Sequence, residues 1–241
     1  MFGLRSRNPV LSRSSLNSGV FAGTEVMSLE SFVNKTGILF MLLVFSFSWV
    51  WNHAHSYGFI IGSAIGALIL GLVTSFNPAA ARITAPLYAL CEGVLLGSIS
   101  KMYEIQSSGL VMQAVLLTFG VFAVMLFLYR SRVIQVTDKM RMIMTSALMA
   151  ICLVYLVNFI MSFFNASIPF ISGSGPFGIL FSVLIVGFAS FMLILDFDMI
   201  EQSIGRVPKQ MEWYCAFALM VSIVWLYLEI LRLLLKLNNR R

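Results

Sequence analysis

Seven stretches of the sequence are fifteen to twenty-three residues long, and together they contain only two charged side chains. A helix crosses the roughly 30 Å hydrocarbon core of a bilayer with about 20 apolar residues. We therefore predict an all-α fold, a single bundle of seven transmembrane helices. The predicted spans are residues 37–51, 57–76, 83–100, 110–128, 142–164, 177–195 and 213–231.

Composition supports a polytopic membrane protein. Of the 241 residues 59% are apolar and 11% are charged, and the mean hydropathy is +0.93, far above the range of soluble domains. Residues 1–33 contain no uninterrupted apolar core, so we interpret them as a short tail and not as a cleaved signal peptide. Residues 34–241 form the transmembrane domain, because the connections are too short for a second domain.

Basic residues predict the orientation. Eleven of the sixteen Lys and Arg residues lie in the tail and in the second-to-third, fourth-to-fifth and sixth-to-seventh connections. The positive-inside rule then places the N-terminus in the cytoplasm and, after seven spans, the C-terminus outside. Arg232 and Lys236 make the C-terminal end basic as well, which leaves a re-entrant last segment as an alternative. The net charge of +6 is mainly a topology signal, and we expect no nucleic-acid binding.

Other motifs favour packing over chemistry. Gly58, Gly62 and Gly66 repeat every four residues, which predicts close contact with a neighbouring helix, although such a stripe could also line a path for a small solute. The three cysteines have no paired spacing, and Met is a common packing residue, so we expect no metal and no cofactor. His53 and His55 fall in the outer loop after the first span, too far from the membrane interior to activate a serine nucleophile.

Four acidic residues lie within or at the end of a predicted span: Glu92, Asp196, Asp198 and Glu229. An ionisable group there costs about 2.5 to 3.5 kcal/mol and is a functional candidate. Asp196 and Asp198 are about 200° apart around a helix, so only one of them can face a given interior path. Glu229 could simply pair with Arg232, three residues on. Glu92 has no cation in its own helix, so we expect a partner from another helix or a protonated carboxyl group.

Two carboxylates on adjacent helices in a low dielectric cannot both ionise cheaply, so they would titrate as a coupled unit. Such a pair would sense pH. When both groups are ionised, their oxygens are ligands of the kind that calcium prefers. One constellation could therefore couple proton concentration to the passage of a cation.

Several segments resemble the bacterial branch of the Bax inhibitor family of seven-helix membrane proteins. They are PLYALCEGVLLGSIS, LDFDMIE, PKQMEWYCAFALMVSIVWLYLEILRLL and the opening RSRNPVLS. The resemblance implies six helices around a central seventh, and a pH-dependent calcium leak controlled by a carboxylate pair. One acid of that pair matches Asp198 and the other matches Glu229. Part of the family has a cationic latch in an inner helix, where the nearest polar position here is Glu92.

We therefore predict a non-enzymatic, pH-sensitive calcium or cation leak channel. The branch that the chain resembles implies a bacterial inner membrane, with an internal eukaryotic membrane as the alternative location. Asp198 faces the seventh helix and pairs with Glu229, Glu92 is an interior polar partner, and Asp196 is a further candidate. The resemblance also includes members that restrain a membrane-bound ATP-dependent protease, so a protease regulator with the basic tail as docking element is the alternative. An intramembrane aspartyl protease is disfavoured, because no Gly-x-Gly-Asp motif surrounds any of the acids.

Overall fold

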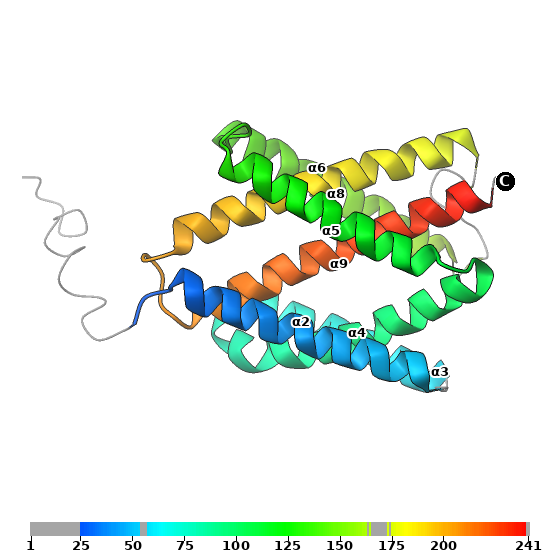
Figure 1. The fold of residues 1–241 in the computed structure, drawn as a ribbon, viewed down its shortest axis with the longest axis horizontal. Coiled ribbons are helices and arrows are strands. Elements are labelled where there is room, and N and C mark those ends of the chain that lie inside the picture. Colours follow the sequence, from blue (N-terminus) through cyan, green and yellow to red (C-terminus); the bar gives the residue numbers. More distant parts are fainter. Residues whose placement is uncertain (1–24, 54–56, 163, 165–172, 174, 240–241) are drawn as a thin grey trace, which may run out of the picture.

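The computed structural model describes residues 25–53, 57–162, 164, 173 and 175–239. Seven long helices follow one another with a short 3-10 turn between the second and the third (Figure 1). All seven are long and apolar enough to cross a membrane, which confirms the predicted seven-span α-helical fold. They are α2 (Leu29–Asn52), α3 (Tyr57–Phe76), η1 (Pro78–Ala80), α4 (Ala81–Gln106), α5 (Leu110–Arg130), α6 (Asp138–Ser162), α8 (Pro176–Ser203) and α9 (Met211–Asn238).

Local sequence signals determine where these helices begin. Ser28 caps α2 by accepting a 3.2 Å hydrogen bond from the Ser31 amide. Gly109 adopts a left-handed conformation (φ 79°) before α5, and Pro176 occupies the first turn of α8, where its missing N–H costs little. The last two helices extend beyond the predicted spans, and α8 continues to Ser203. Its terminal acids therefore lie on the helix itself.

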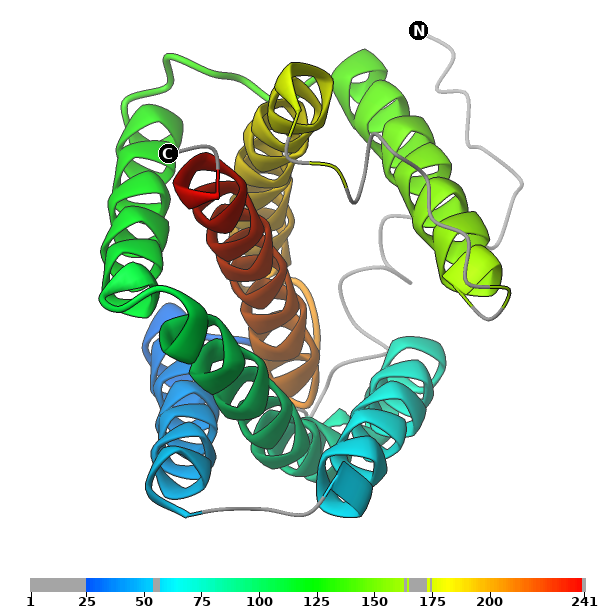
Figure 2. The same cartoon turned by 90° about the vertical axis from the view of Figure 1, so that its right-hand side faces the viewer.

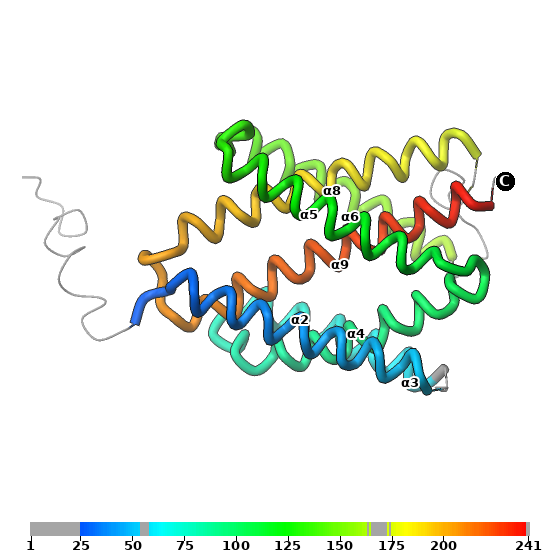
Figure 3. The backbone as a smooth tube through the Cα atoms, viewed as in Figure 1, coloured from blue at the N-terminus to red at the C-terminus, as the bar shows by residue number. Residues whose placement is uncertain are grey.

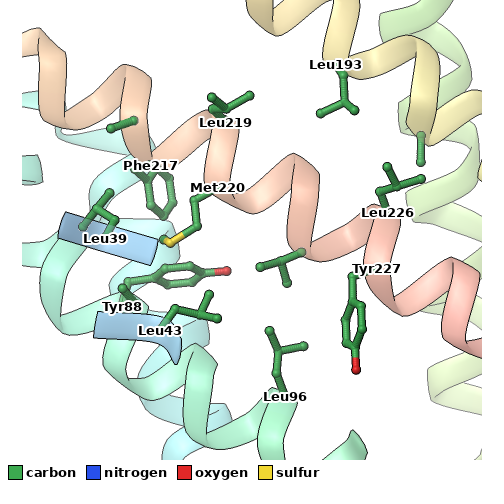
Figure 4. Packing of buried hydrophobic residues seen from close by; sticks show 14 of the residues in the cluster. Leu39, Leu43, Tyr88, Leu96, Leu193, Phe217, Leu219, Met220, Leu226 and Tyr227 are labelled. Atoms are coloured by element: carbon green, nitrogen blue, oxygen red, sulfur yellow. The ribbon is translucent and has the colours of Figure 1, made fainter. Parts of the chain in front are cut away.

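Helix α9 is the centre of the bundle, as the family resemblance implied. It contacts α2, α4, α5 and α8, and Figure 2 shows it surrounded by the other helices. Its buried side chains, among them Phe217, Met220 and Leu226, form the core with Leu39 of α2 and Tyr88 of α4 (Figure 4). A helix that is apolar on most faces is stable only inside such a shell.

Helix α9 runs without a break from one end of the bundle to the other, as the tube in Figure 3 shows. At its end, Asn238 donates a 2.7 Å hydrogen bond to the hydroxyl of Ser107, which follows α4. At its start it adjoins the segment leading into α2, where the Met27 amide donates to the Val207 carbonyl at 2.9 Å. The re-entrant last segment is therefore excluded within the described residues, and the two ends of the described chain lie at opposite ends of the bundle.

The glycine stripe of α3 is not a helix contact along its whole length. No atom lies within 4 Å of a Cβ built on Gly58 or Gly62, and only Gly66 approaches another helix, at 3.3 Å from the Cys91 sulfur. The prediction of close packing is thus wrong for the first two glycines. They line an apolar groove of about 610 Å³ between α2, α3 and α4.

Close approach of helices occurs instead at Gly93 and Gly97 of α4. A Cβ on Gly93 would overlap the Ser46 hydroxyl and the Leu43 carbonyl oxygen of α2, and one on Gly97 would lie 2.9 Å from the Phe47 carbonyl oxygen. Two glycines four residues apart form one flat strip on a helix. This strip brings α4 against the backbone of α2.

Helix α6 differs from the other helices because none of its described residues is buried. It contacts α8 and lies at the outside of the arrangement in Figure 2. Its half-buried residues recur at helical spacing, and they include Met144, Ile151 and Tyr155. One stripe of α6 therefore faces the bundle, and the remainder is left for lipid.

Candidate proton-sensing site

Asp198 lies on the last two turns of α8 and faces α6. The Arg141 guanidinium of α6 donates a 2.7 Å hydrogen bond to its Oδ2 atom, and the two groups form an ion pair. The Gln202 amide, one turn on, donates to the same oxygen at 2.7 Å. Asp198 is half-buried, so its charge is held by a cation from a neighbouring helix at the rim of the bundle.

Glu229 lies on α9 and is only 2% exposed. The Arg232 guanidinium donates to both of its carboxylate oxygens, at 2.9 and 3.0 Å, and the Trp225 indole donates at 3.3 Å. The Tyr155 hydroxyl of α6 donates to the same carboxylate at 2.9 Å and accepts from Arg232 at 2.7 Å. The intrahelical pair that the sequence left as an alternative is thus formed, with a tyrosine from α6 added to it.

The direct pair of Asp198 and Glu229 that the resemblance implied is not formed. Their partners on α6, Arg141 and Tyr155, are fourteen residues apart, about 21 Å along one helix. The physical reason is the connection between α8 and α9, seven residues long, and the two-turn extension of α8, which place Asp198 near the start of α9 and not beside its second half. Each carboxylate has instead its own contact with α6.

Asp196, and not Asp198, faces the central helix. Its carboxylate lies beside the Ser222 side chain of α9. The Oδ2 atom is buried and has no hydrogen-bond partner among the described residues. Ser222 precedes Glu229 by seven residues, which is about 10 Å along α9. The expectation that Asp198 points toward the seventh helix is therefore wrong, since the two aspartates face different helices, as their spacing requires.

Glu92 is buried on α4, and its carboxyl group lies beside the Tyr88 side chain, one turn earlier on the same helix. The Tyr88 ring packs edge-on against Phe217 of α9, with ring centroids 5.0 Å apart. We expected a partner from another helix, and the structure supplies a hydroxyl from the same one. Glu92 lies against α9 through this tyrosine and is separated from the carboxylates that contact α6.

One family model matches the chain along nearly its whole length. Its description is Bax inhibitor 1 like, and it matches residues 8–239. The protein belongs to the Bax inhibitor family. No curated protein and no solved structure matches the chain.

Sequence reasoning missed three residues that determine the geometry of this Bax inhibitor family protein: Arg141, Tyr155 and Glu212. The first two are the contacts of α6 described above. Glu212, in the first turn of α9, is fully buried and accepts from the Ser28 amide at 2.9 Å and the Ser31 hydroxyl at 2.6 Å, and it pairs with Lys35. An acid in a first helical turn is common for electrostatic reasons, so its position in the sequence does not indicate burial.

Proposed function

We propose that this protein is a non-enzymatic, pH-sensitive leak channel for calcium or other cations in a bacterial inner membrane, with its N-terminus in the cytoplasm. Membership of the Bax inhibitor family supports the coarser part of this proposal, a membrane protein of that family. The observation that carries the pH dependence is the attachment of α6 to the bundle. Near the start of this helix and again in its second half, the contact is a hydrogen bond to a carboxylate, first to Asp198 and then to Glu229.

These two contacts depend on protonation. An ionised Asp198 attracts Arg141, and its protonation leaves a neutral group that holds the guanidinium less strongly. Protonation of Glu229 likewise weakens its bond from the Tyr155 hydroxyl, while Arg232 stays beside it on α9. Because α6 has no buried side chain to replace these contacts, acid loosens this helix from α8 and α9. We therefore infer that the leak increases as the pH falls.

Other charged groups adjoin the Asp198 contact. Glu201, one turn on, accepts from the Tyr129 hydroxyl of α5 and pairs with Arg132 at 2.6 Å. These groups join the end of α5 to α8 independently of α6. Release of α6 would therefore leave α5 and α8 joined, so that the opening lies on the α6 side.

Asp196 supplies a binding site for the permeating cation inside the bundle. Its unpartnered oxygen and the Ser222 hydroxyl are hard oxygen donors, which suit calcium. They lie between α8 and the central helix. Glu92 lies on the opposite side, with α4, and serves as a polar partner inside the core.

The test is calcium flux into proteoliposomes, measured from about pH 4 to about pH 8, a range that reaches the ordinary pKa of carboxyl groups. We expect the parent protein to leak more at low pH, and the Asp198→Asn, Glu229→Gln double variant to leak at every pH, because it mimics the protonated state. Glu30→Gln is the matched control, since Glu30 is an exposed acid in the first turn of α2. A double variant with the parent's pH profile and flux would refute this sensor.

A protease regulator is the second candidate, and one observation favours it. The segment before α2 forms an antiparallel bridge from Val26 to Pro208 in the connection between α8 and α9, and the Lys209 amide donates to the Glu25 carbonyl at 2.8 Å. A partner that binds the tail would therefore be positioned next to the start of the central helix. Deleting residues 1–24 should abolish binding of a membrane-bound ATP-dependent protease and leave the leak unchanged.

A further inference from the structure

Lys236 is a buried cation near the end of α9 that the proposed mechanism does not use. Its side chain is 5% exposed. Its ammonium donates to the Ser182 hydroxyl at 2.8 Å and to the Gly178 carbonyl oxygen at 3.1 Å, both on α8. Both acceptors are neutral. The ammonium therefore makes two of its three possible hydrogen bonds, and its positive charge is not balanced.

No carboxylate side chain balances this charge. All ten Asp and Glu residues of the chain lie in the part that the structure describes, and none of them pairs with Lys236. The nearest acid along α9 is Glu229, two turns earlier, and Arg232 between them already neutralises it. The second half of the central helix therefore has a net positive charge.

Lys236 lies near the end of the bundle at which α9 ends. A helix of 28 residues is about 42 Å long, against about 30 Å of hydrocarbon, so the end of α9 extends beyond the hydrocarbon core. Lys236 lies two residues before this end, on the face that contacts α8. On the proposed path, a cation that moves along α9 past Glu229 would reach this ammonium at the contact between α9 and α8.

We propose that Lys236 determines the charge selectivity of the leak, by repelling divalent cations more strongly than monovalent ones at this end of the bundle. The inference rests on the proposed leak function. A fixed charge at a pore mouth acts as an electrostatic barrier for ions of its own sign. The barrier is proportional to the charge of the ion, so it is twice as high for Ca²⁺ as for K⁺. The parent protein thus keeps its calcium leak slow.

The experiment compares Ca²⁺ and K⁺ flux in proteoliposomes that contain the parent or Lys236→Met. Methionine keeps most of the side-chain volume and removes the charge. We expect the ratio of Ca²⁺ to K⁺ flux to rise by roughly threefold or more in this variant. Lys236→Arg should keep the parent's ratio, because it preserves the charge. Lys101→Met is the matched control, since Lys101 is directed at the Trp51 carbonyl oxygen of α2.

The outcomes separate this inference from the leak on which it rests. A parent that conducts, with the same flux ratio in Lys236→Met, refutes the role of Lys236 and leaves the leak intact. No flux from any protein, Lys236→Met included, refutes both. A structural role for Lys236 would lower thermal stability without a change in the flux ratio. If Lys236→Met does not fold, Lys236→Gln provides the neutral variant, and an unchanged ratio there refutes the inference equally.

Discussion

Helices α4 and α6 both belong to the shell around α9, but they are attached to it by different forces. Eleven residues of α4 are buried, and its glycine strip lies against the backbone of α2. In α6 none of the described residues is buried, and its two named side-chain contacts are Arg141 with Asp198 and Tyr155 with Glu229 and Arg232.

The difference separates a fixed part of the bundle from a releasable one. Close packing between apolar surfaces does not change with pH, and in lipid it is the main force that joins helices. A hydrogen bond to a carboxylate does change when that group is protonated. The α2–α4–α9 side can thus maintain the fold while α6 responds to acid.

The largest effect is expected for Gly93→Ala on the fixed side. The new methyl group would overlap the Ser46 hydroxyl and the Leu43 carbonyl oxygen. Overpacking costs about 1 to 3 kcal/mol and can cost more, and here the obstacle includes backbone, which cannot rotate away. We expect a loss of about 3 kcal/mol in unfolding free energy or failure to fold, measured by thermal unfolding in detergent.

Gly62→Ala is the matched control, because open space surrounds a Cβ at that position. Alanine is favoured over glycine in a helix by about 1 kcal/mol, so this variant should be as stable as the parent or more stable. Equal destabilisation by both substitutions would contradict the assignment of the packing strip to α4.

The next largest effect concerns the ion pairs of the two regions. Glu212→Ala leaves Lys35 without its partner where α2 meets α9, and breaking a buried pair costs about 3 kcal/mol. Asp198→Ala breaks a pair with an exposed arginine and should cost less than about 1 kcal/mol. The two variants should therefore differ by at least 2 kcal/mol in unfolding free energy. Similar losses would show that α6 is as firmly attached as α2.

The sequence predicted the part of this architecture that depends on hydropathy. Seven apolar runs determine seven helices, and the family resemblance supplied the central position of the last. The sequence did not predict which residues contact one another across helices, since a contact such as Tyr155 with Glu229 depends on the rotation of α6 about its own axis. Nor did the glycine repeat show which strip is covered, because Gly62 and Gly93 have the same spacing pattern and differ only in their neighbours.

A smaller effect is expected for Arg141→Met, which removes one contact of α6 and leaves the carboxylate. An exposed ion pair contributes up to about 1 kcal/mol, which corresponds to about fivefold in an opening equilibrium. We expect amide hydrogen exchange in the first half of α6 to accelerate by up to that factor at neutral pH, with no change in α4. The parent at acidic pH should approach the variant, after correction for the intrinsic pH dependence of exchange. Acceleration spread evenly over both helices would show general destabilisation.

The smallest effect is expected at the exposed pair of Glu25 and Lys209, which joins the segment before α2 to the connection between α8 and α9. The hydrogen bond and charge of Lys209 lower the pKa of Glu25. A carboxyl group whose pKa is lower in the folded than in the unfolded state stabilises the folded state when the pH is above its pKa in the unfolded state. This contribution is lost as the pH falls through its pKa in the folded state. Lys209→Met should therefore remove the acid dependence of amide protection at Met27, whose N–H donates to Val207, and leave the melting temperature unchanged. Protection at Met27 that still falls with acid in this variant would assign the effect to another group, and Glu212 would be the next to test.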